Sequence, residues 1–412
     1  MRILHTADWH LGKRLDFFSR IQEQQDVLNE ICEIADQEDV DVLVVAGDLF
    51  DTFSPPVEAI ELLYSTLKRL TNHGKRPVIA IAGNHDSADR IDAPDPLARA
   101  CGILFVGYPN AQLSASAATT GFSITKTDKG FIELLLPRYN YPIRILTTPY
   151  ANELRLKHYL GDDDDREAKL HEILSTHWQH LAETYCDTYG ANLLVTHLYM
   201  MKRGGEMLEE PEGEKPLKIG NADLIYTDAI PSSIQYTALG HLHRHHQLGT
   251  ASSPIVYAGS PLAYSFAEAG QEKNVIIVDL APNQSVVYTT HRLHGGRSLA
   301  RKRFDDIDLA VQWLQNNPNT LVELTMVSDT FMTSAALKRL QEAHDGIIHI
   351  IPIVQQQGSA TETAQPVADL EKDVKSLFVD YFHSRYGQQP NEELLSLFEE
   401  INGEIDTQQT ES

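Results

Sequence analysis

Residues 40–51 read VDVLVVAGDLFD, an apolar and largely β-branched run that ends in a glycine and two acids. Such a run is typical of a strand that is buried on both faces, as in the core of a parallel sheet. Gly47 permits a sharp turn at the strand end, and Asp48 follows directly. Burying the Asp48 carboxylate there is costly unless a cation or hydrogen-bond donors meet it. The stretch therefore predicts a buried strand over Val40–Ala46 with a binding residue at its carboxyl end.

The segments on either side of this strand alternate between strand and helix patterns. Strands are predicted at Arg2–His5 and Pro77–Ala82. Apolar residues recur at helical spacing over Gln22–Gln37 and Val57–Leu70, and two prolines precede the second of these helices. This order is typical of an α/β domain whose central sheet is largely parallel.

From residue 122 onward short strands predominate. They are predicted at Ser123–Thr125, Phe131–Leu136, Ile143–Thr147, Leu193–Thr196, Tyr236–Leu239, Ile255–Ala258 and Val275–Leu280. A long helix is predicted over Asp165–Tyr189, after the acidic run Asp162–Asp165, which we interpret as a solvated loop. We therefore expect an α/β fold in which two mixed sheets pack face to face between flanking helices.

Three parts are predicted along the chain. The strand-rich pattern with its polar clusters covers residues 1–281, and a small α/β unit, a capping domain, follows over 282–355. The last part, 356–412, begins as a polar linker and carries 12 acidic residues against 3 Lys and Arg after Ala360. Its two amphipathic helical patterns are Leu377–Tyr386 and Glu392–Ile401. These helices either pack on their own domain or dock on a partner.

Composition restricts the class of protein. The formal net charge is −24, whereas a protein that binds nucleic acid through its own surface is usually basic. The chain therefore acts on small phosphates, draws a phosphate in through metals, or relies on a basic partner. The cysteines are widely spaced and form no CxxC pair, which favours reduced thiols in a cytoplasmic protein. We find no signal-peptide pattern and no apolar run long enough for a membrane span.

Five short polar clusters follow predicted strands within the first 245 residues. They are Asp8-Trp9-His10, Gly47-Asp48-Leu49-Phe50-Asp51, Gly83-Asn84-His85-Asp86, Thr196-His197 and Gly240-His241-Leu242-His243. Any one of them is compatible with unrelated polar residues at a strand end. Together they supply enough oxygen and nitrogen ligands for two divalent metals, an arrangement suited to cleaving phosphate esters. His245 and His246 are interpreted as exposed loop residues and are left outside this set.

The order of these clusters resembles that of the calcineurin-like metallophosphoesterases. The family motifs Asp-x-His, Gly-Asp-x-x-Asp, Gly-Asn-His-Asp, a lone His and Gly-His-x-His occur here in sequence. Longer stretches, HTADWHLG, VAGDLFDTFSPP, AGNHDS, ALGHLHR and YAGSP, closely resemble the SbcD family of bacterial nuclease subunits. The resemblance is strong over about residues 1–280, and the small domain and tail match that family by order and length.

The resemblance implies a role for each cluster residue. One metal is assigned to Asp8, His10, Asp48 and His243. The other is assigned to Asp48, Asn84, His197 and His241, so that Asp48 bridges the two. The expected metal is Mn²⁺, although the donor set also suits iron or zinc. His85 is expected to contact the scissile phosphate or protonate the leaving oxygen, with Asp51 orienting it. Asp86 is expected to bond loop amides.

The same resemblance implies substrates and partners. Family members act with an SbcC-type ATPase on DNA ends and hairpins, as double-strand 3'-5' exonucleases and single-strand or hairpin endonucleases. Their setting is DNA repair, recombination and replication. A homodimer is expected through helices near Pro56–Leu70 and Ser87–Cys101, and the C-terminal helices are expected to hold the ATPase coiled coil. Residues Met201–Ile219 match no motif and form either a substrate-side loop or an insertion.

Two other functions fit the sequence less well than this nuclease. A small-molecule or nucleotide phosphodiesterase of the same superfamily would need neither the small domain nor the helical tail. A non-catalytic scaffold is disfavoured because every expected ligand and His85 are present.

Overall fold

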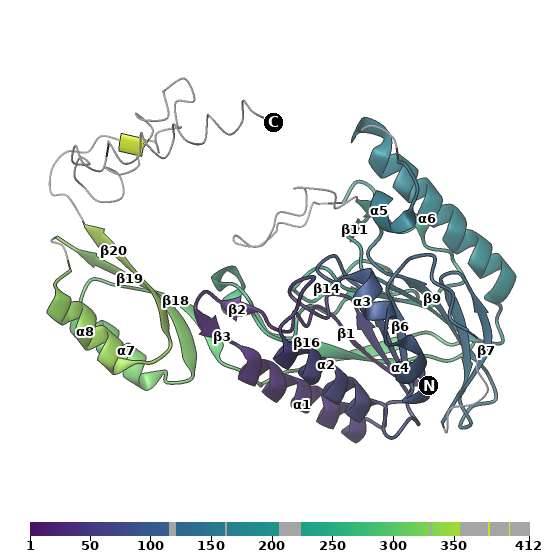
Figure 1. Ribbon diagram of the computed structural model, residues 1–412, viewed down its shortest axis with the longest axis horizontal. Coiled ribbons are helices and arrows are strands. Elements are labelled where there is room, and N and C mark those ends of the chain that lie inside the picture. The colour runs from purple at the N-terminus through teal and green to yellow at the C-terminus, as the bar shows by residue number, and fades with distance from the viewer. Residues whose placement is uncertain are drawn as a thin grey trace. The chain divides into compact units, whose positions relative to one another are not determined.

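Two β-sheets that pack face to face make up the centre of residues 1–292 (Figure 1). The computed structural model describes residues 1–114, 121–160, 163–205, 224–329 and 332–354, together with 378, 379 and 395. Met1–Gln355 form one compact unit and Gln356–Ser412 a second. All elements described below belong to the first unit.

The first sheet contains the strand predicted within residues 40–51. Its strands are β1 (Arg2–Thr6), β4 (Val42–Ala46), β5 (Val78–Ile81), β6 (Ile103–Val106), β16 (Asn274–Asp279) and β17 (Val287–Arg292). Their order is β17-β16-β1-β4-β5-β6, and β1, β4, β5 and β6 run parallel while β16 and β17 are antiparallel. The carboxyl ends of the parallel strands therefore share one edge. Every residue of β4 is fully buried, because both faces of the sheet are covered.

The second sheet repeats this parallel arrangement at its centre. Its strands are β7 (Ser123–Asp128), β8 (Phe131–Leu135), β9 (Ile143–Thr148), β10 (Ala191–Thr196), β13 (Tyr236–Leu239), β14 (His246–Gln247) and β15 (Ile255–Tyr257). The order is β14-β15-β13-β10-β9-β8-β7, in which β9, β10, β13 and β15 are parallel. β7, β8 and β14 add antiparallel edges.

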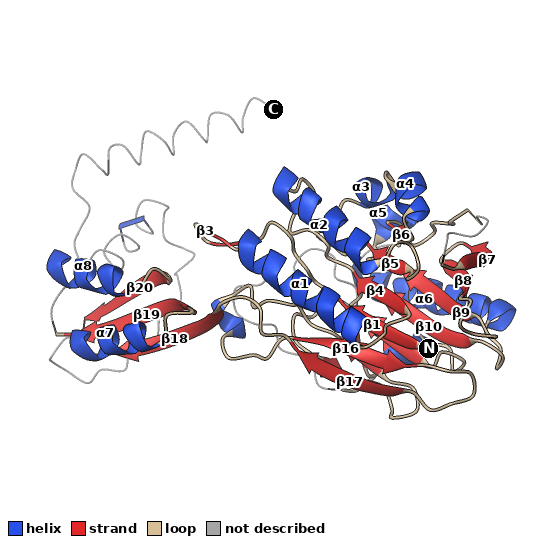
Figure 2. Cartoon of the chain, turned by 90° about the horizontal axis from the view of Figure 1, so that it is seen from below, coloured by secondary structure: helices blue, strands red, loops and turns tan. Residues whose placement is uncertain are grey.

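Helices cover the outer face of each sheet (Figure 2). They are α1 (Ile21–Gln37), α2 (Val57–Leu70), α3 (Ala88–Asp92), α4 (Asp95–Ala100), α5 (Glu153–Leu156) and α6 (Asp163–Tyr185). Alternation along β4 directs Val42 and Val44 to the second sheet, and Leu43 and Val45 to α1 and α2. α6 packs its apolar side on the second sheet, with Trp178 fully buried. Each such burial of a large apolar side chain stabilises the fold by roughly 1.5–3 kcal/mol.

A small parallel sheet follows the two large ones. It consists of β18 (Ser298–Phe304), β19 (Thr320–Ser328) and β20 (Ile347–Val354), with α7 (Ile307–Asn316) and α8 (Ser334–Ala343) on one face. The short hairpin β2 (Arg14–Leu15) and β3 (Phe18–Ser19) reaches it from the loop after β1. Leu15 packs there with Phe266, Leu299 and Ile348, so the hairpin joins the loop that carries the expected ligands Asp8 and His10 to the small sheet.

The remaining short elements lie beside the second sheet or after it. They are β11 (Met200–Met201), β12 (Ile225–Tyr226) and the 3₁₀ turns η1 (Thr227–Ala229) and η2 (Phe266–Glu268). No helix among the described residues is long and apolar enough to cross a membrane.

The expected fold of two mixed sheets between helices is confirmed. β17 joins the first sheet, so pairing in that sheet continues past residue 281 to Arg292. The strands β17 and β18 were not predicted, because half of their side chains are exposed and polar. The expected helices Leu377–Tyr386 and Glu392–Ile401 lie outside the described residues, apart from isolated positions, as does most of Met201–Ile219.

Candidate metal centre

The loops that follow the parallel strands approach one another closely, and three glycines make this approach feasible. A Cβ added at Gly47 would lie 2.1 Å from Nδ1 of His197, and one added at Gly83 would lie 2.1 Å from Oδ1 of Asp48. At Gly240 the added atom would lie 1.8 Å from the carbonyl oxygen of residue 46. No side chain fits at these distances, so glycine is required before each of these ligand loops.

Four of the expected ligands have left-handed backbone conformations. The φ angles are 54° at Asp8, 44° at His10, 49° at Asp48 and 94° at His241. Such values are uncommon for residues other than glycine, and they concentrate at functional sites where the surrounding structure holds them. Here main-chain bonds join the loops, since Asp8 donates to the carbonyl of residue 47 and His10 donates to that of Asp48. Hydrogen bonds between the loops that follow β1 and β4 therefore maintain these strained backbone conformations.

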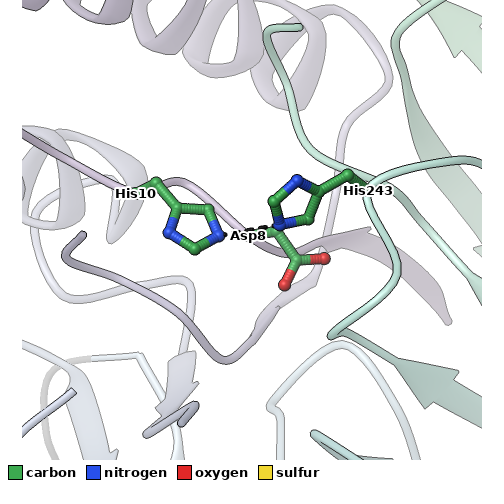
Figure 3. A group of neighbouring side chains, drawn as sticks. All are labelled: Asp8, His10 and His243. Atoms are coloured by element: carbon green, nitrogen blue, oxygen red, sulfur yellow. Dashed lines mark hydrogen bonds between the residues drawn. The ribbon is translucent and has the colours of Figure 1, made fainter. Parts of the chain in front are cut away.

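Asp8, His10 and His243 form the first group of potential ligands (Figure 3). Nε2 of His10 and Nε2 of His243 lie 2.9 Å apart and face one another. One ligand atom from each of the three residues lies within 4.8 Å of the others. Oδ2 of Asp8 is buried and accepts no hydrogen bond from any described residue. A buried carboxylate oxygen beside two converging imidazole nitrogens fits a divalent cation.

Asn84, His197 and His241 form the second group. Oδ1 of Asn84 lies 2.9 Å from Nε2 of His197 and 3.0 Å from Nδ1 of His241. Nδ1 of His197 lies 2.8 Å from the carbonyl oxygen of Ala46 and donates to it. This bond fixes the ring tautomer and leaves Nε2 free to bind a metal.

Asp48 lies between the two groups. Its Oδ2 is 3.5 Å from Nε2 of His10 and 3.4 Å from Nε2 of His197. A single carboxylate oxygen therefore faces one histidine of each group. Its other oxygen, Oδ1, accepts the main-chain N–H of His85 at 2.8 Å.

Burial and the Asp48 carboxylate together determine the charge state of this centre. Burial alone would lower the pKa of His197, but the nearby Asp48 carboxylate raises it to about 9. Burial lowers the pKa of His10 and of His241 to about 3, so both rings are neutral at ordinary pH. Neutral imidazole is the form that binds metals. Burial also raises the pKa of Asp8, because the charged carboxylate is poorly solvated. A bound cation would reverse that penalty, and the residues present therefore fit a divalent metal.

His85 lies beside the first group and is partly buried, with its ring centroid 4.8 Å from that of His10. Its Nδ1 donates to the main-chain oxygen of Asp51 at 2.7 Å. The expected orienting contact from Asp51 thus comes from its carbonyl group. The Asp51 carboxylate instead accepts from Lys13 at 3.0 Å and lies 3.6 Å from Nδ1 of His10.

The expected structural role of Asp86 is confirmed. Its carboxylate is fully buried and accepts the main-chain N–H groups of Leu49, Phe50 and Gly83 at 3.0, 2.9 and 2.8 Å. These bonds tie the loop after β5 to the loop after β4, which carries Asp48.

Residues that the sequence analysis missed surround the first group. The ring of Tyr264 lies 5.5 Å from that of His10 and 6.2 Å from that of His243, and its hydroxyl donates to the carbonyl of Trp9. Glu268 and Lys273 form a buried ion pair beside His243. No signal in the sequence identifies them, because they follow the last motif in a stretch without regular spacing.

The chain is similar to several known proteins. The calcineurin-like phosphoesterase family matches residues 1–226. The D subunit of the nuclease SbcCD of Bacillus subtilis (strain 168) is 33% identical over 413 residues, which cover 97% of each chain. Among solved structures, TT1561 of Thermus thermophilus is 12% identical, with a TM-score of 0.35, over 71% of this chain and 99% of its own. A dimetal phosphatase of Danio rerio is 13% identical, with a TM-score of 0.39, over 70% and 98%. From the family match and the full-length likeness, the chain belongs to the calcineurin-like phosphoesterases and, within them, to the SbcD family of nuclease subunits.

Proposed function

We propose that this chain hydrolyses phosphodiester bonds of DNA at a two-metal centre. The observation that carries the proposal is the position of Asp48, whose Oδ2 lies within 3.5 Å of a histidine nitrogen from each ligand group. A shared carboxylate of this kind is what a pair of dications ~3.5–4 Å apart requires.

The two ligand groups define the proposed metal sites. Asp8, His10, Asp48 and His243 hold one ion, and Asp48, Asn84, His197 and His241 hold the other. We propose Mn²⁺, because imidazole, carboxylate and amide oxygen together suit it. Two ions held by these residues would lower the pKa of water for nucleophilic attack and would offset the negative charge that develops on the reacting phosphate.

His85 is the proposed proton donor to the leaving oxygen. Its main-chain N–H donates to the carboxylate of Asp48, and its Nδ1–H donates to the carbonyl of Asp51. These two hydrogen bonds direct Nε2 away from both residues. Because Nδ1 keeps its proton in that bond, Nε2 can donate only when the ring is the imidazolium ion. The residue is partly exposed, which gives the ring access to solvent protons.

The proposed substrates are DNA ends and hairpins, and the proposed partner is an SbcC-type ATPase. The support is the full-length likeness to the D subunit of the nuclease SbcCD. A net charge of −24 suits a subunit whose partner helps to bind DNA. Double-strand 3'-5' exonuclease and single-strand or hairpin endonuclease activities, in DNA repair, recombination and replication, are the corresponding reactions. The location proposed from this function is the cytoplasm, at the nucleoid.

Two structural features of the assembly belong to the same proposal. We propose a homodimer through α2 and the segment Ser87–Cys101, which would place two centres against the two strands of a duplex. A monomeric mass at micromolar concentration would contradict it. We also propose a three-part division of the chain. The expected boundary at 281 is moved to follow Arg292, because β17 pairs in the first sheet, and the boundary at 355 is kept. The last part is proposed to dock the ATPase.

The function is tested with purified protein and Mn²⁺ on two substrates, a hairpin oligonucleotide and a small phosphodiester. Cleavage of the hairpin at the higher catalytic efficiency supports the nuclease. Efficient turnover of the small diester with no hairpin cleavage would instead identify a small-molecule phosphodiesterase. Absence of both activities in metal-loaded protein would identify a non-catalytic scaffold.

A further inference from the structure

The segment between residues 260 and 273 runs beside the metal-ligand residue His243. The carbonyl oxygen of His243 accepts the main-chain N–H of Ser260 at 3.2 Å and the ammonium group of Lys273 at 2.8 Å. Lys273 also donates to Oγ of Ser260 at 3.0 Å. The backbone of one metal ligand is therefore fixed by a buried cation that lies 30 residues away in sequence.

Glu268 is the counter-ion of Lys273. Its residue is 0% exposed and that of Lys273 is 9% exposed, and the two side chains form a direct ion pair. The other carboxylate oxygen, Oε1, accepts the main-chain N–H groups of Tyr264 and Ser265 at 2.9 and 3.1 Å. Both charges are thus paired and hydrogen-bonded, as buried charges need to be.

The imidazole of His243 lies between the metal site and this ion pair. Its Nε2 faces Nε2 of His10 at 2.9 Å. Its Nδ1, on the opposite side of the ring, is 3.8 Å from Oε1 of Glu268. The ring therefore directs one nitrogen to the ligand group and the other to a buried carboxylate.

We propose that Glu268 and Lys273 are a positioning pair for the metal site of Asp8, His10 and His243. The carboxylate orients the His243 ring through Nδ1, and the ammonium group holds the same residue through its carbonyl. This inference deepens the proposed two-metal function and rests on it. A carboxylate behind a ligating histidine selects the tautomer with a free Nε2 and makes that nitrogen more basic.

A purely structural ion pair would behave differently. Replacing a buried ion pair by neutral groups of similar shape is often neutral or stabilising for the fold. Loss of a carboxylate behind a ligating histidine costs ~10–100-fold in metal affinity. Metal affinity therefore separates the two roles, even where stability is unchanged.

The chain offers a matched control in Glu133 and Arg144. Their side chains are each 6% exposed and form an ion pair at 2.9 Å. Arg144 is the second residue of β9, at the amino end of the strand, whereas the metal ligands follow the carboxyl ends of β10 and β13. Glu133→Gln therefore disturbs a comparably buried ion pair remote from the centre.

The experiment titrates Mn²⁺ into metal-free protein by calorimetry and by electron paramagnetic resonance. The variants are Glu268→Gln, Lys273→Met, the double variant Glu268→Gln/Lys273→Met, and Glu133→Gln. We expect one ion to bind ~10–100-fold more weakly in Glu268→Gln and in the double variant, and the other ion to bind as in the wild type. Glu133→Gln should keep both affinities. Circular dichroism confirms which variants fold, and the double variant leaves no buried charge unpaired.

Wild-type affinity for both ions in a folded Glu268→Gln or double variant would overturn the positioning role. Equal weakening in Glu133→Gln would overturn it too, because any lost ion pair would then have the same effect. If the wild-type protein bound a single ion, the two-metal function would fail on its own. Weaker binding of that ion in Glu268→Gln would still support the pair, and an unchanged affinity would still overturn it.

Discussion

The main-chain N–H of His85 donates a hydrogen bond of 2.8 Å to Oδ1 of Asp48. The residue that lies between the two ligand groups is therefore also the anchor of the proposed proton donor. A change at Asp48 alters metal binding and the placement of His85 together, whereas a change confined to the His85 side chain leaves this anchor in place. Variants at the two positions consequently report on different parts of the centre.

Asp48→Ala should abolish binding of both metals, because its Oδ2 is the atom that faces both groups. His10→Ala should remove mainly the ion of the first group, since the second group keeps Asn84, His197 and His241. Elemental analysis of the dialysed proteins measures this directly. Two ions per chain in Asp48→Ala would contradict a bridging role.

His85→Gln should keep both metals and the fold but lose ~10²–10⁴-fold in turnover, the usual size of a general-acid contribution. Glutamine retains a side-chain group near the Asp51 carbonyl and cannot supply a proton to the leaving oxygen. Single-turnover cleavage of a hairpin oligonucleotide in Mn²⁺ measures the loss. Near-normal turnover by the metal-loaded variant would exclude His85 as the donor.

Gly83→Ala should weaken metal binding and destabilise the protein by roughly 1–3 kcal/mol, as overpacking usually does. The added methyl group would lie 2.1 Å from Oδ1 and 2.2 Å from the main-chain nitrogen of Asp48, so that residue has to move. Gly204→Ala is the control for backbone strain alone, because φ is 73° there and nothing lies within 4 Å of an added Cβ, so that variant should keep metal binding. Metal titration and thermal unfolding of both variants test the prediction, which fails if they behave alike.

Asp92→Asn should stabilise the protein at pH 8 and have little effect at pH 4. Burial raises the pKa of Asp92 from 3.8 to about 6, so the folded state binds more protons than the unfolded state between these values. Stability is therefore lost as pH rises from 3.8 to about 6. The asparagine carbonyl can still accept the N–H of Gly107 that Asp92 accepts. We expect the free energy of unfolding at pH 8 to rise by roughly 1–2 kcal/mol, a figure already reduced to allow for partial solvent exposure. Thermal unfolding at both pH values measures the change in stability. Equal stabilisation at pH 4 and pH 8 would show that the raised pKa of Asp92 is not its cause.

Deleting the residues after Val367 should leave metal binding and Mn²⁺-dependent cleavage of short single strands intact. The same deletion should abolish association with the SbcC-type ATPase and any ATP-linked processing of duplex ends. The reason is the pair of amphipathic patterns in this acidic segment, whose apolar sides need a partner. A pull-down with the ATPase, run beside the nuclease assay, measures both. Retained association would indicate helices that fold back on their own domain.

Local patterns were sufficient to predict the central strands and helices and to select candidate ligands that the structure brings close together. The expected helix Val57–Leu70 has the same bounds in the structure, and the expected strand Val40–Ala46 begins two residues later. Asp48, Asn84 and His197 were predicted because each follows an apolar strand, and parallel strands place their carboxyl ends at one edge. The spacing of apolar residues over a short stretch is sufficient to predict where such strands and helices lie.

Contacts between distant segments were not predictable in the same way. The approach of Glu268 to His243 depends on how the segment after β15 folds back, and no spacing in the sequence encodes that path. The carbonyl rather than the carboxylate of Asp51 contacts His85, because the loop after β4 turns its main chain inward. Residue type alone cannot distinguish these two atoms.

The order of strands in the first sheet has a consequence for synthesis on the ribosome. β1 is the first strand to emerge, yet one of its two neighbours is β16, which ends at Asp279. His10 likewise meets His243 only after 233 further residues have been added. A nascent or prematurely terminated chain that stops just after β10 holds Asp8, His10, Asp48, Asn84 and His197 but neither His241 nor His243. The expected ligand set is therefore complete only once translation has passed His243, so we expect shorter nascent chains to lack the full centre.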